Sequence, residues 1–375
     1  MVTKIRLLYI TRGFHPYKGG AENYISEIHK RLSKKHHISL ITYYHKDRKK
    51  DERIYEVRQL KNAGKFSEFL NFFFSTLKNS LFLDFDIIHA VTYPSGLAAI
   101  LPKLVSGKPL VVTIFDIGVA ESGVGISPIV KNVKSFLQNI VCNVADAIIV
   151  PNKKVQHDIE KYFGVERKFF ISPLGIEPSL FKGARTKSSC GKEPLILFLG
   201  MYSPKKGIDY LMHAVRELHG SGVNAKLVVV GPPLDRNYNK KIRELAAELG
   251  IEKDVRFAGF VEERVKIEWI DKADVCVFPS IYGEGFGLPI VECMARGRPV
   301  IATDIFERLG TVRKDTAIVV PTKDSEAISN SLMNLIKNES LYRRLGEDGM
   351  KFAKKFDLDS CAEITEKVYE KVLKK

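Results

Sequence analysis

The 375-residue sequence lacks the features that define several large classes of protein. It has no run of about 18 or more apolar residues, so no transmembrane helix is expected. Its five cysteines are scattered and odd in number, and no CxxC pair occurs. This argues against a disulfide framework and a zinc site, and fits a reducing compartment. The N-terminal MVTKIRLLYITRG has no small-residue cleavage site, so it predicts a first strand rather than a signal peptide.

Acidic residues are too few to balance the basic ones, and the net charge is +15. The excess is uneven, because residues 1–175 hold 26 Lys and Arg against 15 Asp and Glu, whereas residues 176–375 hold 33 against 29. A basic first half favours an anionic partner such as a phosphate, a nucleic acid or a lipid surface. A single run such as KDRKKDER (46–53) is better explained as a solvated face. No nucleic-acid recognition motif accompanies the charge, so nucleic acid is not the favoured partner.

Apolar runs alternate with stretches of helical periodicity, which predicts an α/β protein. The runs are apolar throughout rather than alternating, as in parallel strands that are covered on both faces. We expect strands in the first half at residues 5–10, 37–44, 86–91, 109–115, 147–151 and 169–173. In the second half we expect them at 195–200, 225–231, 255–260, 275–280 and 299–303, with three closing helices from about residue 324.

Residues 172–194 are rich in Pro, Gly, Ser and charge, and they predict a linker between two doubly wound domains. The expected domains are residues 1–175 and 176–355, with a final helix at about 356–375 packing back on the first. Ligands of such sheets bind beyond the carboxyl ends of the strands.

The segment FSEFLNFFFSTLKNSLFLDF (66–85) predicts an amphipathic helix. We expect one face to carry Phe66, Phe69, Leu70, Phe73, Leu77 and Leu81, and the other to carry Phe72 and Phe74. A core helix packed on the first sheet is the favoured interpretation. The two extra aromatic residues keep a membrane-surface helix as the alternative.

The decapeptide GEGFGLPIVE (283–292) follows an expected strand and opens an expected helix. Its glycines allow backbone N–H groups to approach a ligand, and Pro289 suits a first helical turn. Helix N-termini bind phosphates, whereas the carboxylates of Glu284 and Glu292 suit sugar diols. An anion site between two diol sites describes a nucleotide diphosphate sugar. Two glutamates capping an ordinary turn are the plainer alternative.

The segment FPSIYGEGFGLPIVECMARGRPVIATD (278–304) resembles the donor-site signature of glycosyltransferase family 4, and the resemblance covers essentially the whole chain. It implies the GT-B fold, in which two Rossmann-like domains face a central cleft. FLGMYSPKKGIDYL (198–211) is similar to the strand–loop–helix that opens the family's second domain, and GFVEE (259–263) to its nucleobase loop. YKGGAEN (17–23) is similar to the first-domain glycine loop facing the donor phosphates and the acceptor.

The resemblance implies that Lys206 neutralises the donor diphosphate and that Glu284 contacts the transferred sugar. The donor-binding residues that it implies are Gly19, Gly20, Gly200, Ser203, Val261, Gly285, Phe286, Gly287, Leu288 and Glu292. The expected reaction moves a hexose from a UDP- or GDP-linked donor to a hydroxyl acceptor with retention, as the family is thought to do. The acceptor is expected to be lipid-linked or a polysaccharide precursor.

Three positions depart from the family pattern. Phe115 stands where a His near the transferred sugar is common, and Met201 where an Arg is common. The linker reads Pro-Leu-Gly at 173–175 rather than Pro-Asn-Gly. The first departure removes a hydrogen bond to the donor hexose, and the second leaves the phosphate charge to Lys206, helped by Lys205.

No metal ligand set and no cofactor are expected. Asp84 and Asp86 have DxD spacing, but Asp86 begins a strand far from the second-domain motifs. The alternatives are a non-catalytic nucleotide-sugar-binding subunit and a hydrolysing nucleotide-sugar epimerase. A nicotinamide dehydrogenase is disfavoured, because TRGFHPYKGG (11–20) lacks GxGxxG. We expect a cytoplasmic protein with possible peripheral membrane contact through the basic first domain.

Overall fold

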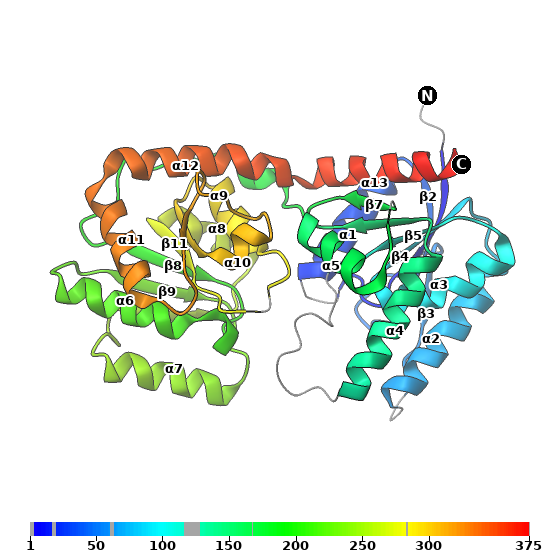
Figure 1. Cartoon of the computed structure of the whole chain (residues 1–375), viewed down its shortest axis with the longest axis horizontal. Helices are drawn as coiled ribbons and strands as arrows, with labels where there is room; N and C mark the ends of the chain where they lie inside the picture. The colour runs from blue at the N-terminus through cyan, green and yellow to red at the C-terminus, as the bar shows by residue number, and fades with distance from the viewer. Residues whose placement is uncertain are drawn as a thin grey trace. The chain divides into compact units, whose positions relative to one another are not determined.

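A computed structural model describes residues 4–16, 20–60, 64–115, 128–166, 168–282 and 284–374. The chain divides into two compact units (Figure 1). Unit 1 comprises residues 1–175 and 358–375, and unit 2 comprises residues 176–357. The boundary between residues 175 and 176 falls inside the predicted linker, and the division assigns the last helix to unit 1.

Within the described part of unit 1, seven parallel strands form one sheet. Their order across the sheet is β3 (Ile54–Val57), β2 (His37–Tyr43), β1 (Arg6–Ile10), β4 (Ile87–Val91), β5 (Leu110–Thr113), β6 (Ala147–Val150) and β7 (Phe169–Ile171). The chain reverses its direction of winding between β1 and β4, which makes this the topological switch point of the sheet. The parallel arrangement confirms the prediction, whereas β3 was not predicted.

Helices cover both faces of this sheet. Those of unit 1 are α1 (Gly20–Leu32), α2 (Lys65–Ser80), α3 (Tyr93–Ser106), α4 (Pro128–Val144), α5 (Lys153–Phe163) and α13 (Leu358–Leu373). One core cluster joins the sheet to α2, α3, α4 and α5, and a second joins the opposite face to α1 and α13. The last helix therefore completes the core of unit 1, although the whole of unit 2 precedes it in the chain.

The predicted core helix is confirmed, and Phe69 and Phe73 pack against the core cluster as expected, but three other positions of the segment differ from the predicted faces. Phe72 is fully buried against Tyr43, with ring centroids 4.9 Å apart, although we expected it opposite the core face. Phe66 is 73% exposed and Leu81 58% exposed, although both were expected on the core face. The reason is that the small side chains of Thr76 and Ser80 face inward with Phe72, so the helix is rotated from the orientation that apolarity alone favours.

Unit 2 repeats the same design. Its described residues form a parallel sheet of six strands in the order β10 (Val255–Gly259), β9 (Lys226–Val230), β8 (Leu195–Leu199), β11 (Val275–Phe278), β12 (Val300–Thr303) and β13 (Ile318–Val320). Strand β13 was not predicted. The longer helices are α6 (Ile208–Gly220), α7 (Arg236–Glu248), α8 (Glu263–Lys272), α9 (Leu288–Ala295), α11 (Ser325–Lys337) and α12 (Glu339–Ala353). Short elements are η1 (Pro178–Phe181), η2 (Pro204–Lys206), α10 (Asp304–Arg308) and η3 (Lys354–Phe356).

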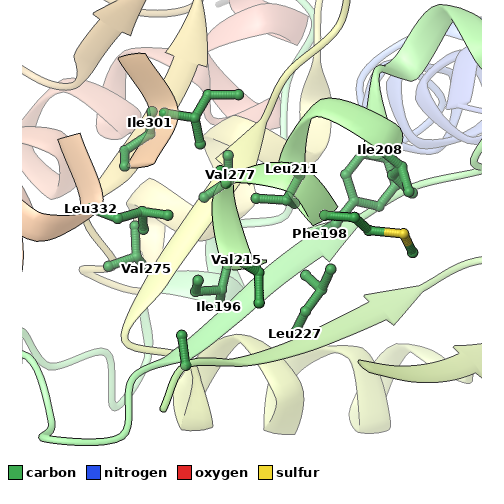
Figure 2. Packing of buried hydrophobic residues seen from close by; sticks show 14 of the residues in the cluster. Ile196, Phe198, Ile208, Leu211, Val215, Leu227, Val275, Val277, Ile301 and Leu332 are labelled. Atoms are coloured by element: carbon green, nitrogen blue, oxygen red, sulfur yellow. The ribbon is translucent and has the colours of Figure 1, made fainter. Parts of the chain in front are cut away.

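The core of unit 2 holds its central strands rigidly. Side chains from β8, β9, β11 and β12 interlock with those of α6 and α11 (Figure 2). The residues labelled there are Ile196, Phe198, Ile208, Leu211, Val215, Leu227, Val275, Val277, Ile301 and Leu332. The loops that leave the carboxyl ends of β8 and β11 thus start from fixed neighbouring points.

Candidate functional site

Two loops of unit 2 are tied together beyond the carboxyl ends of β8 and β11. The backbone N–H of Ile281 donates to the carbonyl of Lys205 at 2.8 Å. Gly207 has a φ of +64°, and a Cβ placed on it would lie 2.1 Å from the carbonyl oxygen of Pro279. Only glycine fits so close an approach in this conformation. The predicted glycine-bearing loop and the predicted donor loop are therefore one structure.

This structure brings the two predicted catalytic residues into contact. The ammonium Nζ of Lys206 lies 2.7 Å from Oε1 and 2.9 Å from Oε2 of Glu284. The hydroxyl of Ser280 donates to Oε1 of Glu284 at 2.7 Å. Thr303, at the end of β12, donates to the carbonyl of Ser280 at 2.7 Å and so fixes the loop from the next strand. The carboxylate is buried, whereas the lysine side chain keeps 23% exposure, enough to meet a ligand.

The glycine-rich turn between Glu284 and α9 carries backbone donors that have no partner among the described residues. Gly287 has a φ of +93°, and a Cβ there would lie 2.7 Å from the ring of Phe306. Phe286 is buried and packs edge-on against Phe356, and its carbonyl accepts from the hydroxyl of Thr311. In the part of the chain that the structure describes, no hydrogen-bond acceptor faces the N–H groups of Phe286, Gly287 and Leu288. They form the start of a helix that can bind an anion.

Glu292 lies in the first turns of α9 and pairs with a lysine that sequence reasoning missed. Its Oε1 is 2.8 Å from the Nζ of Lys266 on α8, and the same ammonium lies 2.8 Å from Oε1 of Glu263. Burial raises the pKa of Glu292 above its ordinary value, and the nearby Lys266 opposes that shift. Burial acts to lower the pKa of Lys266, yet its two carboxylate partners leave it raised. A lone lysine in a helix usually indicates a solvated face, so only the fold reveals this pair.

The remaining predicted donor residues occupy two parts of the structure. Gly200 and Ser203 follow β8, Val261 follows β10, and Gly285 lies in the loop after β11. Ser203 is buried and its hydroxyl has no hydrogen-bond partner among the described residues. Gly20 begins α1 in unit 1, and Gly19 lies outside the described residues.

Two of the positions that depart from the family pattern, Phe115 and Met201, carry apolar side chains. Phe115 packs edge-on against Tyr24, with ring centroids 5.8 Å apart, and Met201 is 45% exposed.

Asp84 and Asp86, which have DxD spacing, both pair with Arg6. The described residues contain no group of three or more His, Cys, Asp or Glu arranged to hold a metal. Metal independence stays a prediction.

Unit 1 has a cavity of about 330 Å³ at the carboxyl ends of β1, β2 and β4. Its lining includes Arg12 after β1, Glu22 on α1, Tyr43 on β2 and Thr92 after β4. The cavity therefore lies at the switch point of the first sheet, where ligands of doubly wound domains bind.

Comparison with known proteins identifies the family. Residues 18–180 match the family model described as Glycosyltransferase Family 4, and residues 184–352 match the one described as Glycosyl transferases group 1. The chain belongs to glycosyltransferase family 4. The resemblance on which the sequence prediction depended is confirmed, and the enzyme is a glycosyltransferase.

Individual relatives agree with this assignment. The chain is 33% identical over 180 residues to a phosphatidyl-myo-inositol mannosyltransferase of Mycobacterium leprae, a match covering 47% of this chain and 46% of that protein. It is 25% identical over 364 residues to an uncharacterized glycosyltransferase of Methanocaldococcus jannaschii, covering 96% of each. The structure of Anabaena HepE in complex with UDP and glucose is similar, with a TM-score of 0.78, 17% identity, and coverage of 98% and 100%. The predicted GT-B fold with two Rossmann-like domains is confirmed.

Proposed function

We propose that this glycosyltransferase transfers a hexose from a UDP- or GDP-linked donor with retention of anomeric configuration. The observation that carries the proposal is the contact between Lys206 and Glu284 beside the open amides of residues 286–288. Glu292 stands one turn further along α9. A cation, backbone donors and two carboxylates match the parts of a nucleotide diphosphate sugar: pyrophosphate, hexose and ribose.

In the proposed reaction the bond between the anomeric carbon and the diphosphate oxygen breaks, and the leaving diphosphate keeps the electron pair. Lys206 and the amides at the start of α9 stabilise the negative charge on that leaving group without having to reorganise. The acceptor hydroxyl forms the new bond from the face that the diphosphate leaves, and its proton passes to the departing phosphate. When the donor binds, the ammonium group of Lys206 contacts the phosphate instead of Glu284. The carboxylate of Glu284 then accepts hydrogen bonds from hydroxyls of the hexose.

The donor is tested by thermal unfolding with UDP, GDP and their hexose conjugates. A nucleotide present at about a hundred times its dissociation constant should stabilise the protein by about 2.7 kcal/mol. We expect Glu292→Ala to abolish most of this shift, because the ribose loses its carboxylate. Glu268→Ala is the matched control, since Glu268 is an exposed glutamate on α8 that lies outside the nucleobase loop and pairs with Arg264. No shift with any nucleotide, or equal shifts in both variants, would contradict the donor site.

Two rivals give different outcomes in the same system. A non-catalytic nucleotide-sugar-binding subunit is favoured by the apolar Phe115 and Met201, and would bind donor without ever releasing the nucleoside diphosphate. A hydrolysing epimerase would convert the sugar with no acceptor present. Product analysis with and without an acceptor mixture separates both from transfer.

We further propose that unit 1 contacts a membrane surface and that the acceptor is lipid-linked. Phe74 and Phe82 are 59% and 82% exposed, and Phe136 on α4 is 64% exposed. Helices α2 and α4 flank α3 on one side of unit 1 (Figure 1), and Lys78 lies on the exposed side of α2. No helix among the described residues could cross a membrane, so contact would be at the surface.

Membrane contact is tested by co-sedimentation with phosphatidylglycerol vesicles. Changing Phe74 and Phe82 together to Ser should weaken vesicle binding at least tenfold, since a single fully buried large apolar side chain already contributes about 1.5–3 kcal/mol. Leu234→Ser, at a 52% exposed position of unit 2, is the control. Equal loss in both variants, or no binding by the unaltered protein, would contradict the proposal.

A further inference from the structure

A buried hydroxyl holds the glycine-rich turn before α9. Thr311, in the turn that follows α10, is fully buried, and its hydroxyl donates to the carbonyl of Phe286. Phe286 is itself only 3% exposed. Among the described residues no backbone N–H donates to that carbonyl, so Thr311 supplies its hydrogen bond. The two residues lie 25 positions apart in the chain.

This hydrogen bond decides where the next amide points. The peptide between Phe286 and Gly287 is trans, and in a planar trans peptide the C=O and the N–H point in opposite directions. Because the carbonyl of Phe286 points at Thr311, the N–H of Gly287 points away from Thr311. That N–H is one of the amides of residues 286–288 that have no acceptor in the described part of the chain. The bond from Thr311 therefore fixes the direction of one donor of the candidate anion site.

The glycine at position 287 makes such a restraint necessary. Gly287 has a φ of +93°, and glycine adopts positive and negative φ about equally readily. The peptide before it can therefore turn over with little backbone strain, which would point its N–H to the opposite side. A side chain would oppose that rotation, but a Cβ placed on Gly287 would lie 2.7 Å from the ring of Phe306. The turn thus needs a partner outside itself to hold this peptide.

Phe306 on α10 connects the parts of this arrangement. Its ring lies against Gly287, and its carbonyl accepts from the N–H of Thr311 at 2.9 Å. Phe306 is 2% exposed, so the core of unit 2 holds it in place. The segment 306–311 therefore contacts both residues of the Phe286–Gly287 peptide, one through an aromatic ring and the other through a hydroxyl.

We propose that Thr311 is a positioning residue of the donor site, and that it directs the N–H of Gly287 at the diphosphate of the nucleotide sugar. Because Thr311 is fully buried, it acts through the Phe286–Gly287 peptide rather than by touching the ligand. An amide that already points at the phosphate does not have to reorganise as charge develops on the leaving group. The inference rests on the proposed function, which puts the diphosphate at this turn. Thr311 lies outside the family signature at 278–304, so only the fold points to it.

Calorimetry with UDP, GDP, pyrophosphate and the phosphate-free uridine and guanosine tests the proposal. Thr311→Val keeps the shape of the side chain and removes the hydroxyl, whereas Thr311→Ser keeps the hydroxyl. We expect Thr311→Val to bind pyrophosphate and the nucleoside diphosphates at least tenfold more weakly, because hydrogen bonds to charged groups are among the strong ones. Thr311→Ser should retain most of the affinity for these anions. Binding of the nucleosides should be the same in both variants and in the unaltered protein.

Thr316→Val is the matched control. Thr316 is also buried in unit 2, and its hydroxyl donates at 3.1 Å to the carbonyl of Arg313, which is not part of the donor turn. This variant should bind pyrophosphate as the unaltered protein does. Should Thr311→Val fail to fold, Phe306→Leu serves instead, because it removes the ring that lies against Gly287. It should weaken the binding of pyrophosphate and leave that of the nucleosides unchanged.

Four results would overturn the inference. They are normal pyrophosphate affinity in Thr311→Val, an equal loss of affinity for nucleosides and for pyrophosphate, a loss in Thr311→Ser or Thr316→Val as large as in Thr311→Val, and no pyrophosphate binding by the unaltered protein. If the unaltered protein binds pyrophosphate but neither UDP nor GDP, the proposed function alone is contradicted. The pyrophosphate measurements then still decide whether Thr311 positions the anion site.

Discussion

The two units share one architecture but treat charge differently at the ends of their strands. In unit 2 the cations Lys206 and Lys266 are each in contact with a glutamate. In the cavity of unit 1, Arg12 stacks on the ring of Tyr43, and neither Arg12 nor Glu22 makes an ion pair among the described residues. In both units the doubly wound sheet brings charged side chains together at the carboxyl ends of its strands. The two sites differ in whether those side chains form ion pairs with each other. A ligand that binds to an ion pair must replace one of its charged partners. A ligand that binds to an unpaired charged side chain does not have to break an ion pair.

The largest effect should come from removing the cation beside the leaving group. Lys206→Ala should slow release of nucleoside diphosphate a hundredfold or more, because loss of a charged contact to the leaving group costs about 2.7–4 kcal/mol in the barrier. Steady-state assays with the donor found by thermal unfolding measure it. The neighbouring Lys205→Ala is the comparison, and should be slowed far less. A near-normal rate in Lys206→Ala would remove that residue from the mechanism.

A smaller effect should follow when the second pair of unit 2 is broken. In Lys266→Met the buried Glu292 loses its ammonium partner, so the pKa of Glu292 rises further and the carboxylate becomes protonated as the pH falls. The UDP affinity of this variant should therefore begin to fall at a higher pH than the UDP affinity of the unaltered protein.

Calorimetry at several pH values measures this dependence. Lys272→Met is the matched control, because Lys272 is an exposed lysine on the same helix. A flat pH profile in Lys266→Met would mean that Glu292 keeps its charge without Lys266. Lys266 would then have a structural role and would not maintain the charge of Glu292.

The last effect concerns stability, and it should single out unit 1. His89 is buried there between Tyr369 Oη at 2.5 Å and Thr113 Oγ1 at 2.8 Å, and burial lowers its pKa to about 3. Burial similarly lowers the pKa of His29 to about 4. Because the unfolded chain takes up these protons near pH 6.5, stability is full above that pH and is lost as the pH falls toward 3.

Each such histidine should contribute a slope of up to about 1.4 kcal/mol per pH unit between about pH 6 and 4. Denaturant unfolding at a series of pH values should show that slope, and His89→Gln should reduce it by the share of one group. An unchanged slope in His89→Gln would mean that His89 is not the source.

The strands were predictable from the sequence where the apolar runs are long. The predictions failed where a run is short or is interrupted by a polar residue. The strands around Leu7 and Val228 are unbroken apolar runs, whereas β3 contains Glu56 and β13 is three residues long. The face of α2 was misassigned because close packing of Thr76 outweighs its polarity. Both kinds of error arise from tertiary contacts that periodicity does not contain.

The candidate site was likewise predictable only where its residues lie close together in the sequence. The donor loop was predictable because glycine, proline and carboxylates lie within ten consecutive residues. The contact between Lys206 and Glu284 joins residues 78 positions apart, and that between Lys266 and Glu292 joins residues 26 apart. Resemblance to the family placed Lys206 and Glu284 in one site, but nothing in the sequence pointed to Lys266 or Arg12.

The placement of α13 in unit 1 has a consequence for biosynthesis. A ribosome makes all seven strands of that sheet first, yet Tyr369 and Val368, which close one of its faces, emerge almost 200 residues after β7. Unit 2, contiguous from 176 to 357, can finish folding while α1 alone covers that side of the earlier sheet. The part of the chain that is synthesised first is therefore the last to mature, and a nascent chain stalled before α13 would expose the apolar surface that α13 covers.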